Sequence, residues 1–231
     1  MHKIVDTMLV LKRVDYGESD RIVTVLSSSG GKFSLLAKGV RKPKSKLAGG
    51  IEPFCINSVT YLQSPRELKT LVSATATQQL SGITGNIDTL NTGYLLLRTI
   101  HVFTEHECED VYYSLTEQSL LGLNNRIDRQ VVYVWFMVQL LYVSGHAINT
   151  NTDDKGQDLQ QKDTFRFDMQ AMAFTADPYG VFTANHIKLL RVVPVMTLQQ
   201  FALVQNVQQL AGDLSGLLAD IASNIMQTNL K

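Results

Sequence analysis

The stretch that decides the fold is DRIVTVLSSSGGKFSLLA, residues 20–37. Residues 22–26 are β-branched and apolar, which is the composition that strands prefer. A glycine pair at residues 30–31 can adopt the positive φ of a hairpin turn. Residues 33–37 then alternate apolar with polar, as expected of a strand that packs one face only. The stretch therefore predicts an antiparallel hairpin.

Further strands follow this hairpin after a long interruption. Residues 39–54 have no usable period and are rich in Gly and Pro, so we expect a loop. Residues 55–62 and 68–76 resume strand composition on either side of a turn at residues 64–65. About five short strands bury too little surface as an open sheet, so we predict a small closed barrel of the OB type.

The period changes to 3.6 from about Ile87, which indicates helices. Residues 127–142 and 198–225 carry apolar side chains at helical spacing. Thr183 is positioned to cap a short helix through Leu190. Thr197 and Gln200 have capping-box spacing, so the last helix is expected to begin there. The fold class is thus α+β with two domains, an OB-type barrel at residues 1–80 and a mainly α-helical domain at residues 81–231.

The charge is divided between these two parts. The whole chain is neutral, with 21 basic and 21 acidic residues. Residues 1–80 hold 12 Lys and Arg against 6 Asp and Glu, a net of +6, whereas residues 81–231 hold 9 against 15, a net of −6. A basic barrel followed by an acidic helical part predicts that the barrel meets an anionic partner.

The densest cation cluster lies in the predicted loop: Lys38, Arg41, Lys42, Lys44 and Lys46. A solvated surface loop would explain it equally well by composition, but loops of an OB barrel flank the groove that binds a single strand. Backbone phosphates are then the expected ligands. Tyr16 and Tyr61 are candidates for stacking on bases, whereas Phe33 has the phase of a core residue.

Catalytic and metal sites have weak support. Asp15, Glu18 and Asp20 could form a nuclease-type metal cluster, but this composition is also typical of a turn between strands, which we favour. His101 and His106, near Glu105, Glu107 and Glu109, are five residues apart and do not share a helix face. Neither a P-loop nor a dinucleotide-binding glycine motif occurs in the sequence, so binding of ATP or of a dinucleotide is not predicted.

The sequence favours a cytoplasmic protein. Its two cysteines, Cys55 and Cys108, are too far apart for a metal-ligand motif and are expected to be reduced thiols. The longest apolar stretch, residues 131–143, is shorter than the roughly 20 residues of a membrane span, and the N-terminus does not resemble a secretory signal.

Several motifs together resemble the bacterial RecO family. They are Tyr16-Gly17-Glu18-Ser19-Asp20-Arg21-Ile22-Val23, Gly31-Lys32, Ala37-Lys38-Gly39-Val40-Arg41-Lys42-Pro43-Lys44-Ser45 and Glu52-Pro53-Phe54. The match is specific over about residues 4–76 and weaker, though collinear, beyond them. Within these motifs, Arg21 and Lys32 join the five loop cations as expected DNA-binding residues.

The resemblance implies a DNA repair and homologous recombination mediator. Such a protein binds single- and double-stranded DNA, anneals complementary strands and helps to load recombinase, without catalytic turnover. It acts with a RecR-type partner and with the acidic C-terminal tail of the single-stranded DNA-binding protein. We accordingly expect association with the nucleoid. The tail needs an apolar pocket with basic neighbours, and the basic residues of the helical part that could recognise it are Arg98, Arg126, Arg129, Lys188 and Arg191.

One departure concerns zinc. Many members of the family hold a four-cysteine zinc module, and the equivalent stretch here, at about residues 147–182, contains no cysteine. Zinc is therefore not predicted. Residues 149–163 are polar and expected to form an exposed insertion, and a small hairpin around Phe165 and Phe174 would depend on apolar packing.

Two other functional classes remain open. The helical domain could be a protein-interaction adaptor with the barrel as a mere scaffold, or the chain could be a nuclease using the carboxylates of residues 15–20.

Overall fold

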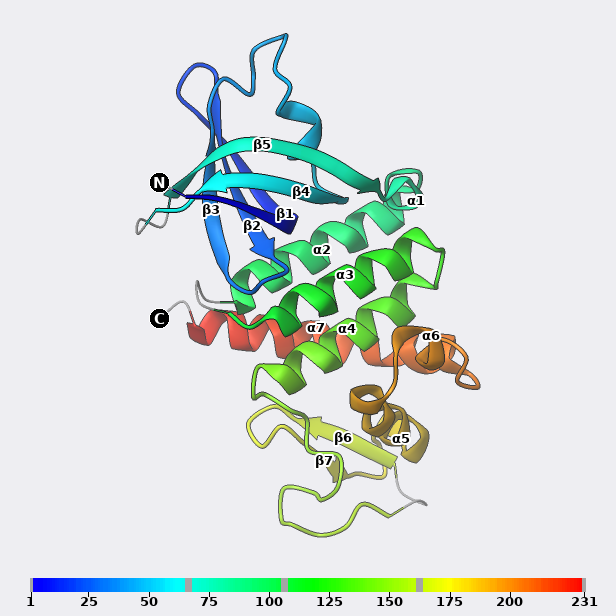
Figure 1. The fold of residues 1–231 in the computed structure, drawn as a ribbon. Coiled ribbons are helices and arrows are strands. Elements are labelled where there is room, and N and C mark those ends of the chain that lie inside the picture. The colour runs from blue at the N-terminus through cyan, green and yellow to red at the C-terminus, as the bar shows by residue number, and fades with distance from the viewer. Residues whose placement is uncertain (1, 65–67, 105–107, 161–163, 230–231) are drawn as a thin grey trace. The chain divides into compact units, whose positions relative to one another are not determined.

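The computed structural model describes residues 2–64, 68–104, 108–160 and 164–229. Residue 65 of the predicted turn at residues 64–65 lies outside the described residues. Glu105, His106 and Glu107 also lie outside them. The chain forms two compact units, residues 1–125 and residues 126–231 (Figure 1). The boundary predicted at residue 80 separates strands from helices along the chain, whereas packing groups the first helices with the strands.

Five strands of the first unit close into a barrel with the order β1-β2-β3-β5-β4. Strands β3 and β5 are parallel, and all other neighbours are antiparallel. This is the five-stranded Greek-key arrangement of an OB fold, so the predicted fold class is confirmed. The strands are β1 (Lys3–Tyr16), β2 (Asp20–Ser27), β3 (Lys32–Ala37), β4 (Cys55–Leu62) and β5 (Leu68–Gln79).

Alternation along the strands fills the barrel. Val23 and Val25 of β2 pair with β3 residues of the same face, and Leu35 and Ala37 are fully buried beside them. Phe33 is also in this core, as its phase predicts. Each large aliphatic side chain buried in this way stabilises the fold by roughly 1.5–3 kcal/mol relative to exposure.

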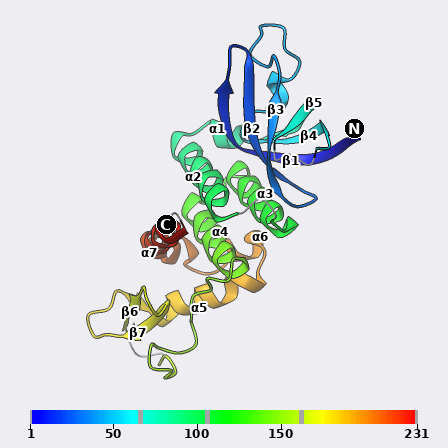
Figure 2. The same cartoon turned by 90° about the vertical axis from the view of Figure 1, so that its left-hand side faces the viewer.

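Three helices complete the first unit: α1 (Ser81–Thr84), α2 (Ile87–Phe103) and α3 (Asp110–Asn124). The carboxamide oxygen of Asn86 accepts hydrogen bonds from the Asp88 and Thr89 amides, which fixes the start of α2. Helices α2 and α3 pack side by side against β1 and β2 at one end of the barrel (Figure 2). The β2–β3 turn meets them there, because the Gly31 N–H donates to the Cys108 carbonyl at 2.8 Å.

The second unit is built around α4 (Arg129–Val143), which lies beside α7 (Val207–Asn229) in Figure 1. Asp128 caps α4 through the amides of Gln130 and Val131. Nearly every side chain of α4 between residues 131 and 141 is buried, which is the expectation for a helix that is apolar all round. Among the described residues, no helix combines the length and apolarity needed to cross a bilayer.

The predicted single C-terminal helix from Thr197 is wrong. Thr197 and Gln200 do form the capping box, but helix α6 (Leu198–Phe201) ends after one turn. Asn206 then takes a positive φ of 59°, and its carbonyl accepts the first hydrogen bond of α7 from Leu210. The capping box stabilises only the first turn, so it predicts where a helix begins and not how far it continues.

The cysteine-free stretch contains a small sheet, as predicted for the hairpin. Strands β6 (Thr164–Asp168) and β7 (Ala173–Ala176) pair, and β8 (Phe182–Thr183) adds to β6. Phe174 is fully buried and makes edge-on ring contacts with Phe167 and Phe182. Helix α5 (Ala184–Val192) follows with the predicted Thr183 cap, and a 3₁₀ turn, η2 (Val193–Val195), leads to α6.

Candidate nucleic-acid interface

The segment that contains the basic loop, residues 38–46, packs against the barrel at two positions, Val40 and Gly50. Val40 points into the barrel core and is 3% exposed. On the far side, η1 (Ala48–Gly50) passes so close to β5 that a Cβ on Gly50 would lie 2.2 Å from the Ala74 carbonyl carbon. Only glycine permits this approach. Four of the five loop cations lie between these two anchors, and Lys38 lies just before the first.

All five cations of the basic loop are exposed: Lys38, Arg41, Lys42, Lys44 and Lys46. Figure 1 shows the segment after β3 at the end of the barrel remote from α2, together with the β1–β2 turn. Successive turns shape it, with the Lys42 N–H donating to the Gly39 carbonyl and the Ser45 N–H to the Lys42 carbonyl. The structure thus brings the five predicted loop cations together on one end of the barrel.

The β1–β2 turn supports the loop through its backbone. The Arg41 N–H donates to the Ser19 carbonyl at 2.9 Å. The Gly39 N–H donates to Asp20 Oδ1 at 2.7 Å. These two hydrogen bonds order the loop without involving its cationic groups. The Arg41 guanidinium also reaches the turn, with its Nη1 donating to the Gly17 carbonyl at 3.5 Å.

Asp15 links two of the predicted DNA-binding residues. Its Oδ1 accepts a hydrogen bond of 2.9 Å from Arg21 Nε, and its Oδ2 lies 3.5 Å from Arg41 Nε. The hydrogen bond from Arg21, with the charge of Arg41, lowers the pKa of the Asp15 carboxyl. Arg21 and Arg41 therefore belong to one charge cluster with Asp15 between them.

Lys32 does not belong to this cluster, which corrects its predicted role. It is 8% exposed, and its Nζ donates to the His101 carbonyl at 2.7 Å and to the Thr104 carbonyl. These carbonyls end helix α2, where the helix dipole favours a cation. The Lys32 side chain points away from the packed interior of the barrel, as its phase predicts, but α2 covers that face. Its ammonium group is therefore used inside the unit.

The two tyrosines predicted to stack on bases, Tyr16 and Tyr61, differ in exposure. Tyr16 is 54% exposed at the end of β1, near the β1–β2 turn, and can offer a ring face to a base. Tyr61 is 4% exposed in the barrel core, where its ring tilts against Phe33 at 5.2 Å. Lys69 Nζ lies 5.2 Å from the Tyr61 ring centroid. A buried ring has no open face, so the expected stacking role of Tyr61 is wrong.

Sequence reasoning missed an aliphatic row on the outer face of the barrel. Val14 pairs with Ile22, Ile22 with Leu36 and Leu36 with Thr70 across four neighbouring strands. Val14 is 49% exposed, and Ile22 and Leu36 are half-buried. The β2–β3 face is where OB folds bind oligonucleotides, and this row borders the Arg21 and Lys38 positions. The strand register, which the sequence alone left undefined for β1, is the signal that would have found it.

The carboxylates of the nuclease hypothesis do not converge on a metal site. Asp15 faces two arginines, Asp20 accepts from the Gly39 amide, and residues 17–19 form the turn that we favoured. Within the described ranges no group of three or more His, Cys, Asp or Glu side chains could hold a metal ion. Glu105, His106 and Glu107 of the other metal-like cluster lie outside those ranges.

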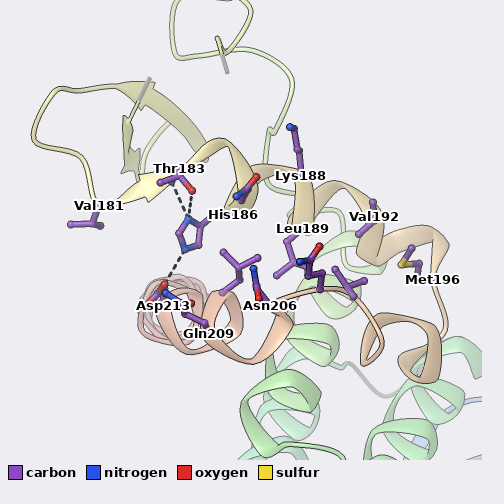
Figure 3. A pocket seen from close by; sticks show the side chains of 14 residues that line it. Val181, Thr183, His186, Lys188, Leu189, Val192, Met196, Asn206, Gln209 and Asp213 are labelled. Carbon is purple, nitrogen blue, oxygen red and sulfur yellow. Dashed lines mark hydrogen bonds and ion pairs between the residues drawn. The ribbon is translucent and has the colours of Figure 1, made fainter. Parts of the chain in front are cut away.

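Two cavities among the described residues of the second unit have both apolar and polar lining residues. The larger, about 630 Å³, lies between α5 and the start of α7 and is lined by Leu189, Val192 and Leu210 with polar residues at its rim. Figure 3 shows His186 reaching from α5 to Asp213 of α7, with Nε2 to Oδ2 at 3.2 Å, while its Nδ1 accepts the Thr183 N–H.

The smaller cavity, about 380 Å³, is lined mostly by apolar side chains: Val138, Leu141, Tyr142, Ala147, Ile148, Leu190 and Pro194. Among the described residues that line it, Arg191 alone is charged, and its Nε donates to the Thr150 carbonyl at 3.0 Å. The two cavities therefore differ in charge, since Lys188 and Asp213 both line the larger one.

The barrel and part of the chain beyond it are similar to known proteins. The family model described as "Recombination protein O N terminal" matches residues 1–80, which comprise the whole barrel. Residues 1–80 are thus similar to the N-terminal domain of RecO proteins. Proteins called "DNA repair protein RecO" are similar to it well beyond the barrel, over up to 149 residues.

Three RecO relatives illustrate the likeness. That of Salinibacter ruber is 29% identical over 134 residues, which is 57% of this chain and 51% of the relative. That of Anaeromyxobacter dehalogenans is 31% identical over 147 residues, 63% and 58% of the two chains. That of Myxococcus xanthus is 52% identical over 54 residues, 23% and 22%. The chain spans about half the length of the first RecO relatives it matches.

The cysteine-free stretch does not fit the zinc module expected from the resemblance. The stretch at about residues 147–182 has no thiol to bind zinc. Its small sheet is packed by Phe165, Phe174 and Phe182 instead.

Proposed function

We propose that this protein is a non-catalytic recombination mediator that binds single- and double-stranded DNA through the basic loop and anneals complementary strands. The observation that carries the proposal is the gathering of five exposed cations on one end of an OB barrel. Proteins similar to this chain are named "DNA repair protein RecO". Helping recombinase to load onto DNA is part of the same proposal.

The mechanism follows from charge. Each Lys or Arg that contacts a phosphate releases condensed counterions, which gives affinity with little sequence preference. Two strands held at the same cationic surface repel one another less, so complementary strands pair faster. The aliphatic row of residues 14, 22 and 36 offers an apolar surface beside the loop for bases, and Tyr16 offers a ring.

The test replaces Lys38, Arg41, Lys42, Lys44 and Lys46 with Ala and measures binding of a fluorescent single strand across salt concentrations. If all five contact phosphates, the slope of log affinity against log salt falls by roughly 3.5, since each contact contributes about 0.7. Annealing of complementary strands slows in parallel.

The matched control removes five exposed cations elsewhere: Arg98, Arg129, Lys155, Arg166 and Lys188. It changes net charge equally and is expected to leave the slope nearly unchanged. Equal slopes for wild type and loop variant would rule out the basic loop. Absence of all binding at low salt would favour the adaptor alternative, and degradation of labelled DNA with Mg²⁺ or Mn²⁺ would revive the nuclease.

We further propose that the acidic tail of a single-stranded DNA-binding protein docks in the smaller cavity of the second unit. The supporting observation is charge: Arg191 lines an otherwise uncharged apolar cavity, whereas Asp213 in the larger cavity would repel an acidic tail. Arg191→Ala is expected to weaken binding of a tail peptide about tenfold, as truncation of a central arginine often does. Lys188→Ala is the matched control. A greater loss of tail-peptide affinity in Lys188→Ala than in Arg191→Ala would move the site to the larger cavity.

A RecR-type partner is also proposed, without an assigned surface.

A further inference from the structure

Asp15 stands out at the proposed DNA interface because it is a carboxylate placed between two cations assigned to phosphate. Each of its oxygens faces a different guanidinium group, Arg21 on β2 and Arg41 on the basic loop. All three side chains are partly open to solvent, with relative exposures of 51% for Asp15, 24% for Arg21 and 39% for Arg41.

A phosphodiester presents the same chemistry as this carboxylate. It has two non-bridging oxygens that share a negative charge, and arginine binds carboxylate and phosphate with the same planar donor geometry. Asp15 therefore occupies, from within the chain, the position that a backbone phosphate would need in order to contact Arg21 and Arg41 together.

The loop does not depend on Asp15 for its position. The Arg41 N–H donates to the Ser19 carbonyl and the Gly39 N–H to the Asp20 carboxylate, and these two bonds hold the loop beside the β1–β2 turn. Release of the two guanidinium groups from Asp15 would leave these bonds in place. A solvent-exposed ion pair is also weak and is readily exchanged for another anion.

We propose that Asp15 is an internal competitor of DNA, which pairs with Arg21 and Arg41 in the free protein and yields both to a phosphate when a strand binds. This rests on the proposed function and adds a residue that restrains affinity. Restraint suits a protein that must release its product, because two annealed strands leave the surface sooner when the carboxylate can recover its partners.

The experiment compares Asp15→Asn with Glu18→Gln by salt titration of single-strand binding. Glu18 is exposed in the adjoining β1–β2 turn, forms no ion pair with any described residue, and loses the same charge when substituted. Asp15→Asn is expected to bind about threefold more tightly at low salt and to steepen the salt slope by roughly 0.7 for each added phosphate contact. Glu18→Gln is expected to change the slope little. Asp15→Glu keeps the charge and should bind as the wild type does.

The outcomes separate this inference from the proposed function. If the five-alanine loop variant loses slope while Asp15→Asn equals Glu18→Gln, only the competitor role is overturned. If Asp15→Asn binds more weakly, Asp15 positions the arginines and the inference is also overturned. If the loop variant itself keeps its slope, the proposed function fails. A thermal melt of each variant checks the fold, which Asn should preserve because its amide oxygen still accepts from Arg21.

Discussion

The two ends of the barrel use their charged residues in opposite ways. At one end, the basic loop is ordered by backbone hydrogen bonds and apolar anchors, its four lysines are exposed, and Arg41 forms a partly exposed ion pair with Asp15. At the other end, Lys32 is buried against the last carbonyls of α2. Nearby, the Asp6 carboxylate accepts hydrogen bonds from the hydroxyls of Ser27, Ser28 and Ser29.

The difference teaches that the number of cations in a segment does not measure its capacity to bind an anion. What matters is whether internal acceptors already satisfy each cation. Lys32 is the first residue of β3 and Lys38 follows its last, yet of these two only Lys38 is exposed.

The largest effect is expected at the end of the barrel where Lys32 is buried. Lys32→Met removes the ammonium and leaves two carbonyls of α2 without their donor. Hydrogen bonds to a charged group contribute about 1.5–3 kcal/mol, so the free energy of unfolding is expected to fall by about 2–3 kcal/mol. Urea unfolding measures it. Salt titration of the folded variant should give the wild-type slope, and a reduced slope would return Lys32 to the DNA interface.

A pH titration sharpens the same contrast. Burial, followed by the charges of Lys32 and Lys12, lowers the pKa of His101. The unfolded chain, with a histidine pKa near 6.5, then binds more protons than the folded one in mildly acidic solution. The free energy of unfolding is therefore expected to decline as the pH falls from about 7 through the folded pKa of His101. Urea midpoints at several pH values measure the decline.

His101→Gln should flatten this pH dependence, and Lys32→Met should make it shallower because one of the two cations is gone. His146→Gln is the control, since His146 is exposed. A decline that persists unchanged in His101→Gln would assign it to other groups.

The smallest expected effect tests the open end. Lys44 is exposed on the basic loop, so Lys44→Ala should change the free energy of unfolding by no more than about 0.5 kcal/mol. The single-strand salt slope is expected to fall by about 0.7. A stability loss as large as that of Lys32→Met would contradict the distinction between the two ends.

Much of the barrel followed from local patterns in the sequence. The glycine pair at residues 30–31 does adopt positive φ, and the period-two phase of Phe33 correctly placed it in the core. The same phase was available for Tyr61, because Val59 two residues earlier is buried on the same face of β4. The stacking role was assigned to Tyr61 because its ring is aromatic, although its strand phase indicates a core position.

Lys32 could not have been predicted from local pattern. Its strand phase correctly directs it away from the barrel interior, but phase does not show that α2 covers that end of the strand. The pairing of Asp15 with Arg41 likewise depends on how a loop folds back on a turn more than twenty residues earlier. Long-range packing of this kind is absent from any single window of sequence.

The close approach of Gly50 to Ala74 has a practical consequence for engineering. Val40 packs in the barrel core and Gly50 packs against β5. We therefore expect that the segment between these two residues can be replaced as a unit. Its length and composition could be redesigned, for instance with extra arginines or a shorter reach, while the supporting scaffold stays intact.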